Sequence, residues 1–344
     1  MYNLDYSRQQ GAAQLQVMKS SHVVQVGVGS GSNLVMQLVR MGVGKITFVD
    51  PDIVEARNVT SQGYTLDDAV AATPKVLALQ RDCKAINPEA LIIPMHEDFV
   101  AMSDNQIKEI LSDATVLIMT TDYHPAQARG ALAGMVCDVP TILASLYRRG
   151  RAGEIVFTYP GVTQGCYRCI TNDRYDYVAT QRTSGTGNAA GSLPFAASYI
   201  DSIVGHLAVG IIHKRLGAAD NPYAQWLDLL GQRNFIQTRM APDYTLGNDD
   251  IFGDVFGHGD KVFAFDSIWQ SGAAETKLTC PDCHGKGTVP IGVRFSETTC
   301  VEKLWTCGCL IQAGTARREC PSCGSSTLDC SRTVSKHSEE RSEW

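Results

Sequence analysis

Short apolar runs alternate with stretches of helical periodicity through the first 150 residues of the chain. Each run is short, apolar and bounded by turn residues, which predicts a buried strand. The predicted strands lie at 22–28, 45–49, 91–95, 115–120 and 141–145. The segments between them repeat apolar residues every three to four positions, which predicts helices. The predicted helices lie at 34–41, 74–86, 103–111 and 125–137. This alternation predicts a Rossmann-like α/β fold with helices on both faces of the sheet.

The second half of the chain is less regular. Residues 150–159 predict an outer strand, so the sheet is expected to be mixed rather than purely parallel. Residues 193–216 are apolar but interrupted by polar side chains, which favours a buried helix over a membrane span. The residue pattern at 225–239 predicts one or two further strands, and that at 262–269 predicts a short aromatic strand.

Changes in composition divide the chain into three parts. Residues 1–270 form the α/β domain, which begins with an arm at 1–20. Within it, residues 171–192 are polar and rich in Gly, Thr and Asn, and a loop of that length is usually functional. Residues 271–330 are rich in cysteine and predict a zinc-ribbon-like extension. Residues 331–344 are polar and charged and predict a disordered tail.

A glycine-rich turn, GVGSGS at 27–32, joins the first strand to the first helix. Glycine lets the backbone approach a phosphate, and a helix start supplies N–H donors and the positive end of its dipole. Asp50 ends the second strand about twenty positions further on, where a carboxylate can hold a ribose hydroxyl. These features predict a nucleotide site, although a tight turn with a satisfied surface Asp would have the same sequence. The predicted ligands here are Gly27, Gly29, Ser30 and Asp50.

Two charged residues occupy other positions that suit a ligand. Lys75 lies in the first turn of a predicted helix, where a cation opposes the helix dipole. A cation held against its local field is a candidate ligand for an anion. Asp122 follows the fourth strand, and ligands of such sheets collect at the carboxyl ends of the strands. Its carboxylate is therefore a candidate ligand for a Mg²⁺ that bridges phosphates.

Charge and hydropathy narrow the function classes. The 344 residues carry a net charge of −6, which gives no basic footprint, so nucleic acid is not an expected partner. Apolar residues make up 44%, which excludes wholesale disorder. No window of eighteen unbroken apolar residues and no signal-peptide pattern occurs. We therefore expect no membrane association and a cytoplasmic location.

The twelve cysteines are interpreted in the light of that location. In a reducing compartment, close cysteine pairs indicate zinc rather than disulfides. The predicted ligand pairs are Cys166 and Cys169, Cys280 and Cys283, Cys307 and Cys309, and Cys320 and Cys323. Eight ligands suffice for two tetrahedral sites, but the sequence does not decide which pairs share a site. Cys83 and Cys137 are expected to be small buried apolar residues.

Taken in order, these motifs resemble those of the ThiF/MoeB/HesA superfamily, the ATP-dependent enzymes that include the ubiquitin-activating enzymes. The similarity covers about residues 5–240. The first matching positions are Arg8 in YSRQ, the glycine turn, Asp50, Asp52, Asn58 and Gln62. The later ones are Lys75 in TPKVLA, Asp122, Arg129 seven residues on, and Cys-Tyr-Arg-Cys at 166–169.

The resemblance implies a ThiF-type adenylation domain over 1–270, with 171–192 as its crossover loop. ATP would bind with Mg²⁺ on Asp122. The implied ATP ligands are Gly27, Gly29, Ser30, Asp50, Asp52, Asn58, Gln62 and Lys75. The implied catalytic residues are Arg8, Lys75 and Asp122.

The implied substrate is the C-terminal carboxylate of a small ubiquitin-like (β-grasp) protein. This carboxylate would attack the α-phosphate of ATP and give an acyl-adenylate and pyrophosphate. Such a reaction needs positioning and charge neutralisation more than covalent chemistry from the protein. By the same resemblance, Arg8 would reach into the neighbouring subunit's site in a homodimer.

The sequence departs from the family pattern in two places. Ser61 stands where the family has an arginine between Asn58 and Gln62, so Arg57 or another group must substitute, or activity is reduced. The loss of one such charge can cost about 10²–10³-fold in rate. Residues 170–279 contain no cysteine that could form a thioester. We therefore expect the adenylate to pass directly to a sulfur acceptor protein or a conjugating enzyme.

Three other functions are compatible with parts of the pattern. One is ATP-dependent activation of a small molecule or a tRNA base, and another is a nucleotide-binding scaffold with weak catalysis, which Ser61 favours. The third is an NAD-dependent oxidoreductase. Ser32 replaces the third glycine of the dinucleotide fingerprint, and Lys75 has no role in hydride transfer, so this third function is disfavoured.

Overall fold

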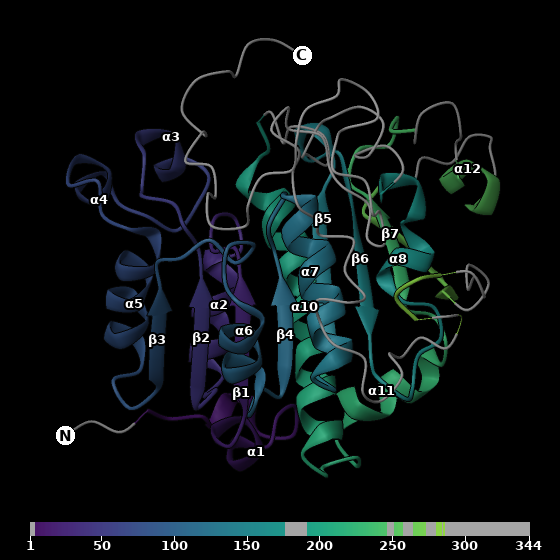
Figure 1. Cartoon of the computed structure of the whole chain (residues 1–344), viewed down its shortest axis with the longest axis horizontal. Coiled ribbons are helices and arrows are strands. Elements are labelled where there is room, and N and C mark those ends of the chain that lie inside the picture. Colours follow the sequence, from purple (N-terminus) through teal and green to yellow (C-terminus); the bar gives the residue numbers. More distant parts are fainter. Residues whose placement is uncertain are drawn as a thin grey trace, which may run out of the picture.

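An eight-stranded mixed sheet forms the centre of the part of the chain that the structure describes (Figure 1). The computed structural model describes residues 4–175, 191–245, 251–256, 264–272, 280–283 and 285. The strands are β1 (His22–Val26), β2 (Lys45–Val49), β3 (Leu91–Met95), β4 (Val116–Met119), β5 (Thr141–Leu146), β6 (Ala152–Thr158), β7 (Phe235–Arg239) and β8 (Asp266–Gln270). Their order across the sheet is β3-β2-β1-β4-β5-β6-β7-β8.

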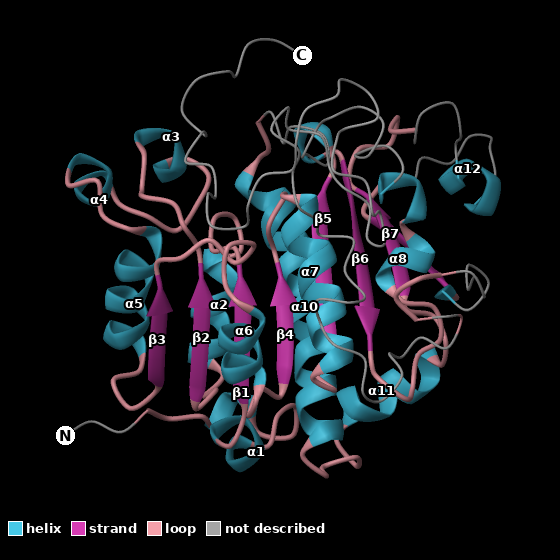
Figure 2. Ribbon diagram, in the orientation of Figure 1, coloured by secondary structure: helices cyan, strands magenta, loops and turns pink. Residues whose placement is uncertain are grey.

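The first five strands are parallel, and the last three pair antiparallel. The carboxyl ends of β1 to β5 therefore lie along one edge of the sheet, where the arrowheads point in Figure 2. The predicted mixed α/β sheet is confirmed. The predicted tail at 331–344 and most of the predicted cysteine-rich extension lie outside the described residues.

Helices cover both faces of the sheet (Figure 2). The α-helices are α1 (Leu15–Lys19), α2 (Ser32–Arg40), α3 (Ala56–Val59), α4 (Leu66–Val70), α5 (Lys75–Ile86), α6 (Asp104–Leu111), α7 (His124–Val136), α8 (Tyr167–Ile170), α10 (Pro194–Arg215), α11 (Pro222–Leu230) and α12 (Ile251–Phe256). The 3-10 turns are η1 (Ser7–Gln9) and η2 (Arg148–Gly150).

The strand side chains alternate between two cores, as the pleat requires. Val116 and Ile118 of β4 belong to the core under α2, α5 and α10. Leu117 and Met119 belong to the core under α6 and α7. Because every side chain of β4 is buried on one face or the other, this strand is apolar throughout.

Helix α10 meets the length and composition expected of a membrane span. Its Leu207, Ala208 and Ile211 are nevertheless fully buried in the core that α10 shares with α2 and the sheet. Such packing is that of the central helix of a globular domain, as the sequence predicts.

One predicted element is wrong. Residues 225–239 were expected to form strands, but α11 occupies Pro222–Leu230 and only Phe235–Arg239 is a strand. The helix has a strong start signal: the Asn221 side chain accepts a hydrogen bond from the Tyr223 N–H, and Pro222 fills the first helical position. The apolar content of the segment concealed that signal.

The arm at the start of the chain runs along the amino ends of the strands, the edge opposite the arrowheads. His213 of α10, fully buried, accepts a hydrogen bond from the Gln14 N–H at 2.9 Å. Asn221, also buried, donates to the Ala12 carbonyl at 2.9 Å. The arm is therefore attached through its backbone to residues about two hundred positions away.

The outer edge of β3 offers few groups for pairing. The backbone groups of Leu91 and Met95 form hydrogen bonds toward β2. The backbone groups of residues 92 and 94 therefore point away from β2, toward the open edge of the sheet. Position 94 is proline, which has no N–H, and the Ile92 carbonyl accepts from the Gln80 side chain at 3.2 Å.

Candidate functional site

The glycine turn lies tightly against the end of β4. Gly27 has a φ of +86°, and a Cβ there would lie 2.8 Å from the Thr121 nitrogen. A Cβ on Gly31 would lie 2.5 Å from the Thr120 hydroxyl. The Gln25 amide donates to the carbonyls of Gly27 and Gly31 and to the Thr120 hydroxyl. Both glycines are therefore required by close packing, and the turn is fixed beside Thr120 and Thr121.

Gly29 and Ser32 face a different neighbour, the segment after α3. A Cβ on Gly29 would lie 3.4 Å from the side chain of Gln62, an ordinary contact. The Ser32 hydroxyl accepts from the Gly63 N–H at 3.0 Å. Ser32, which disfavours a dinucleotide site, therefore joins the start of α2 to this segment. The side-chain oxygen of Gln62 is buried and has no hydrogen-bond partner among the described residues, so it could accept a bond from a ligand.

Asp50 supports the glycine turn directly. One carboxylate oxygen accepts from the Val28 N–H at 2.8 Å, and the other accepts from the Asp52 N–H at 2.9 Å. Only 5% of Asp50 is exposed, and burial raises its pKa, an effect that the charge of Lys75 opposes. Asp50 is therefore not the satisfied surface residue of the alternative interpretation. Its oxygens keep lone pairs for a further donor, such as a hydroxyl.

Lys75 and Asp52 form an ion pair at the same edge. The Lys75 ammonium donates to an Asp52 carboxylate oxygen at 2.8 Å, and the Lys75 N–H donates to the Asp52 carbonyl at 2.9 Å. The two partners differ in exposure, because 7% of the Lys75 side chain is exposed against 64% of Asp52. A buried cation thus has a solvent-facing partner that an anionic ligand could displace.

The turn after helix α3 carries Ser61, the position where the family arginine is missing. The Asn58 side chain accepts from the Glu55 N–H at 2.8 Å and so stabilises the start of this short helix. Arg57, a candidate substitute for that arginine, is mostly exposed and pairs with Glu55. The Ser61 hydroxyl donates to the Arg57 carbonyl at 3.4 Å. Arg57 is therefore engaged within its own turn.

Asp122 is exposed at the carboxyl end of β4. It directly follows Thr121, whose nitrogen abuts Gly27, so the structure brings Asp122 to the glycine turn. Arg129, which also matches the family pattern, has another role: it donates to the carbonyls of Val100 and Met102. It therefore fixes the loop before α6.

Arg8 lies far from the glycine turn of its own chain. It belongs to η1 and is exposed, and no hydrogen bond or ion pair engages its side chain among the described residues. The neighbouring Gln9 side chain donates to the carbonyl of Arg40, at the end of α2 remote from the turn. Nine helical residues span about 13 Å, so Arg8 does not meet the other predicted ligands within one chain.

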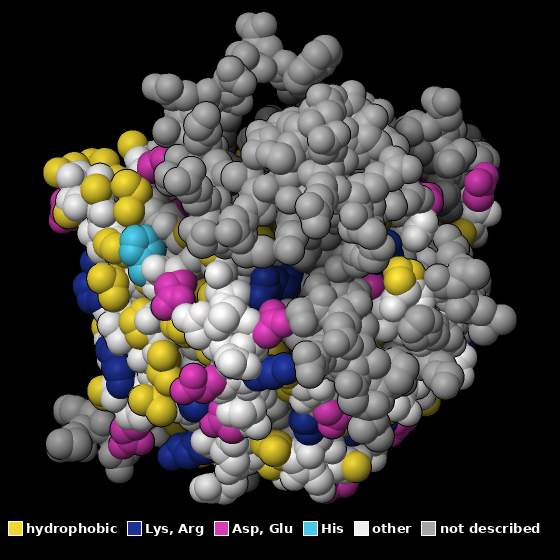
Figure 3. Space-filling view, in the orientation of Figure 1, with side chains coloured by type: hydrophobic (Ala, Val, Ile, Leu, Met, Phe, Trp, Pro, Cys, Tyr) yellow, Lys and Arg dark blue, Asp and Glu magenta, His cyan; other side chains and the backbone are white. Residues whose placement is uncertain are grey.

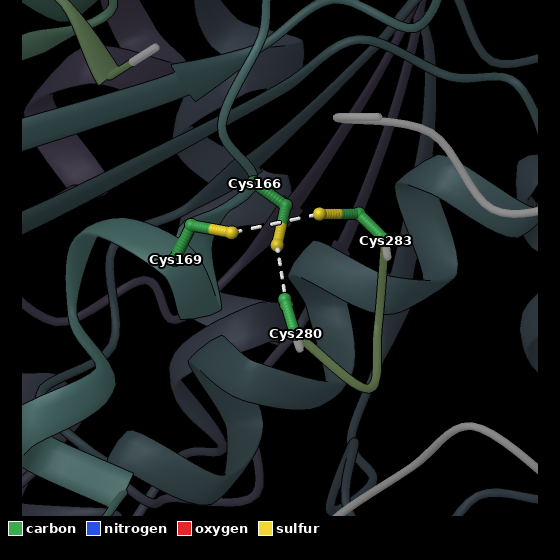
Figure 4. Close-up of side chains that lie close together, drawn as sticks. All are labelled: Cys166, Cys169, Cys280 and Cys283. Atoms are coloured by element: carbon green, nitrogen blue, oxygen red, sulfur yellow. Dashed lines mark hydrogen bonds between the residues drawn. The ribbon is translucent and has the colours of Figure 1, made fainter. Parts of the chain in front are cut away.

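Four cysteines from two distant segments form a compact cluster (Figure 4). The sulfurs of Cys166, Cys169, Cys280 and Cys283 all lie within 4.8 Å of one another, and all four residues are buried. Cys166 approaches Cys280 at 3.6 Å, and Cys169 approaches Cys283 at 3.5 Å. Contacts with the other thiols, and burial, raise the pKa of Cys166 well above its ordinary value. A buried four-sulfur set suits tetrahedral Zn²⁺.

This arrangement answers the pairing question for two of the four predicted cysteine pairs, because Cys166 and Cys169 lie with Cys280 and Cys283. The other predicted ligands, Cys307, Cys309, Cys320 and Cys323, lie outside the described residues. They stay a prediction.

Several buried polar residues between the two sites have no counterpart in the sequence prediction. His124 begins α7 and is 3% exposed, and burial, with the charges of Arg174 and Arg168, lowers its pKa to about 4. Glu154 of β6 is buried and forms an ion pair with Arg174, whose side chain is partly exposed. Only Arg168, inside a cysteine motif, carried a signal in the sequence.

Charged side chains are mixed on the face shown in Figure 3. Among the described residues visible there, Lys and Arg alternate with Asp and Glu rather than gathering by sign. This distribution agrees with the net charge of −6 and with the absence of a basic footprint in the sequence.

The chain is similar to known proteins over much of its length. The ThiF family matches residues 2–242. The SAMP-activating enzyme E1 of Haloferax volcanii is 29% identical over 156 residues, which cover 44% of this chain and 53% of that protein. The sulfur carrier protein ThiS adenylyltransferase of Escherichia coli is 26% identical over 172 residues, which cover 49% and 66%. The matched region thus spans about half to two thirds of these relatives.

Among solved structures, a crystal structure of E. coli MccB is similar with a TM-score of 0.51. It is 17% identical, and the match covers 72% of this chain and 69% of that one. At this identity the similarity concerns the fold alone.

Proposed function

Because this chain belongs to the ThiF family, we propose that it is an adenylyltransferase that uses ATP to activate the C-terminal carboxylate of a small ubiquitin-like, β-grasp protein. The names of two relatives, a SAMP-activating enzyme and a sulfur carrier protein adenylyltransferase, support this class of reaction. The side chains at the carboxyl edge of the sheet are also of the kinds that an adenylation reaction with ATP needs.

The observation that carries the proposal is the asymmetric ion pair at that edge. Lys75 is buried, whereas its partner Asp52 is mostly exposed. A phosphate could therefore take the place of the Asp52 carboxylate with a change of one side chain and none of the fold. Lys75 would then neutralise charge on the reacting phosphate, where fixed donors are worth most.

The remaining predicted ligands have roles that follow from their positions. The backbone of the glycine turn at 27–31 would face the phosphates, and Asp50 would accept from a ribose hydroxyl. Gln62 would use the buried oxygen that has no partner among the described residues. Asp122 would hold Mg²⁺, which supplies a positive charge that bridges the phosphates.

The reaction balances without a covalent intermediate on the protein. A carboxylate oxygen of the substrate attacks the α-phosphorus, and the bond from that phosphorus to the oxygen bridging it to the β-phosphorus breaks. Pyrophosphate leaves, and the acyl-adenylate remains. Residues 170–279 contain no cysteine, so a sulfur acceptor protein or a conjugating enzyme would take the acyl group directly.

Arg8 would complete the site from a second copy of the chain. We call the carboxyl edge of the sheet, with the glycine turn at 27–31, Asp50, Asp52 and Lys75, the nucleotide edge. Arg8 lies beside the far end of α2 and so away from the nucleotide edge of its own chain. We propose a homodimer in which each arm reaches the partner's site. We also propose structural Zn²⁺ on the four clustered cysteines, and a cytoplasmic location, where such thiols stay reduced.

The test combines ligand binding with ATP–pyrophosphate exchange. ATP·Mg at 100-fold over its Kd should stabilise the zinc-loaded protein by about 2.7 kcal/mol, and NAD should not. Lys75→Met should abolish the shift and lower exchange, measured with a candidate β-grasp protein, by about 10²–10³-fold. The matched control is Lys45→Met, because Lys45 pairs with Asp113 at the other edge of the sheet. Stabilisation by NAD alone would refute the proposal.

A nucleotide-binding scaffold is the second candidate, and Ser61 is the observation that favours it. No arginine fills that position, and Arg57 is engaged with Glu55. A scaffold would bind ATP·Mg without pyrophosphate exchange. Ser61→Arg should then create exchange activity, whereas in an active enzyme it should change the rate by less than about tenfold.

A further inference from the structure

A chain of buried hydrogen bonds joins the tetracysteine cluster to the nucleotide edge. Tyr167 lies between Cys166 and Cys169, is 1% exposed, and donates from its hydroxyl to the Gln127 side-chain oxygen at 2.7 Å. Gln127 is fully buried, and its amide nitrogen donates to the Thr121 carbonyl at 2.8 Å. Thr121 directly precedes Asp122. Two hydrogen bonds therefore connect Tyr167, which lies between the first two cysteines, to the residue that precedes the predicted magnesium ligand.

A second set of contacts reaches the same segment. Arg168, also between the two cysteines, pairs at 3.2 Å with Asp282, which lies between Cys280 and Cys283, and both side chains are largely buried. The Arg168 guanidinium lies 4.6 Å from the centre of the Tyr175 ring. The Tyr175 ring packs edge-on against His124 at 4.6 Å. His124 begins α7, so both routes converge on residues 121–124.

The bonding of Gln127 depends on Tyr167 for a chemical reason. A glutamine amide offers an acceptor at one end and donors at the other. The Tyr167 O–H, as a donor, selects the orientation in which the oxygen faces it. The nitrogen then faces the Thr121 carbonyl and the Ser145 hydroxyl, at 2.8 and 2.7 Å. Without the hydroxyl, a buried acceptor is left unpaired and the amide is held less firmly.

We propose that Tyr167 and Gln127 are positioning residues through which the tetracysteine centre holds the segment 121–124, and with it Asp122, at the nucleotide edge. The metal site then does more than stabilise the fold, because loss of metal would loosen the segment that carries the magnesium ligand. The role of Asp122 in this inference rests on the proposed function, whereas the coupling between cluster and segment does not.

Tyr167→Phe tests the coupling, because it removes one hydroxyl and keeps all four cysteines. The full-length variant should retain its zinc. Amide hydrogen exchange in a peptide covering 120–126 should accelerate about tenfold, and the Kd for ATP·Mg should rise by a similar factor. The matched control is Thr238→Val, which removes a hydroxyl that donates to the Asp266 carbonyl from a fully buried residue of β7. It should leave both readouts within about twofold.

Removal of zinc by a chelator is the second part of the experiment. In the wild-type protein it should accelerate exchange in the 120–126 peptide. In Tyr167→Phe the further acceleration should be smaller than in the wild type, since the route through Tyr167 is already broken and only the route through Arg168 remains. Unchanged exchange in zinc-loaded Tyr167→Phe would overturn the inference, even if the metal-free protein unfolds. Hydrogen exchange reads the coupling whether or not ATP binds, so failure of the proposed function would be separately visible.

Discussion

The nucleotide edge and the tetracysteine cluster are assembled from the chain in opposite ways. The glycine turn, Asp50, Asp52 and Lys75 all lie within one stretch of about fifty residues, in successive strand–helix units. The cysteine cluster joins two short segments whose members are 114 positions apart. The first site is local in sequence and the second is not.

The two sites also differ in the partners that the protein itself provides for their polar side chains. At the nucleotide edge, Asp50 accepts two backbone N–H groups, and Lys75 pairs with Asp52. The four buried thiols lie close to one another, with Cys166 3.6 Å from Cys280 and Cys169 3.5 Å from Cys283. The contacts at the nucleotide edge are thus made by the fold itself, whereas the cysteine cluster would become a strong cross-link on binding an ion.

The largest expected effect is at the cluster. Cys283→Ser should remove the metal and lower the free energy of unfolding by about 4 kcal/mol, the linkage expected when free zinc exceeds its Kd 1,000-fold. Thermal unfolding with and without a chelator, together with zinc analysis, measures this. Cys137→Ser is the control, because Cys137 lies apart from the cluster. Equal stability of Cys283→Ser and wild type would remove the distinction between the two sites.

The next effect concerns Arg8, which we propose a second copy of the chain supplies to the nucleotide edge. Arg8→Ala should lower pyrophosphate exchange by about 10²-fold, or about 2.7 kcal/mol, because a charge at the reacting phosphate is lost. A mixture of Arg8→Ala and Lys75→Met copies should recover part of the activity, since one intact site then receives one intact arm. If the mixture stays as inactive as its components, the arm does not act between copies.

The smallest expected effect is on the free energy of unfolding, through the ion pair between Asp68 and Arg81. Two hydrogen bonds from Arg81 to Asp68 lower the pKa of Asp68 from 3.8 to about 2. The folded pKa lies below the unfolded one, so the stabilisation is complete above about pH 4 and is lost as the pH falls through 2. Arg81 is half exposed, which limits the contribution to about 1–2 kcal/mol.

Asp68→Asn should therefore lower the free energy of unfolding by about 1–2 kcal/mol at pH 7, and the difference from wild type should disappear near pH 2. Denaturant unfolding across this range measures it. Asp67→Asn, at an exposed neighbouring position, should change little. A difference between Asp68→Asn and wild type that does not vary with pH would show that the ion pair is not its source.

Most of the fold and of the nucleotide edge could be predicted from the sequence, because their signals are local. The strands, the glycine turn and the positions of Asp50 and Lys75 depend on patterns a few residues long. The partner of Lys75 could not be predicted, because it follows from the antiparallel bridge between Ile53 and Pro74.

The pairing of the cysteines and the bond from Tyr167 to Gln127 could not be predicted either. Each depends on how α7, α8 and the segment at 280–283 pack together, and spacing along the chain carries no record of that packing. Residues 225–239 were misassigned for a related reason: apolar content was weighed above the capping signal at Asn221 and Pro222.

The outer edge of β3 has a consequence for how the protein behaves at high concentration. Growth of a fibre by strand pairing needs two open edges on every molecule, one to receive a neighbour and one to be received. At the β3 edge, Pro94 has no N–H to offer and the Ile92 carbonyl is already bonded to Gln80. A neighbouring strand would therefore find fewer partners there, which disfavours open-ended polymerisation.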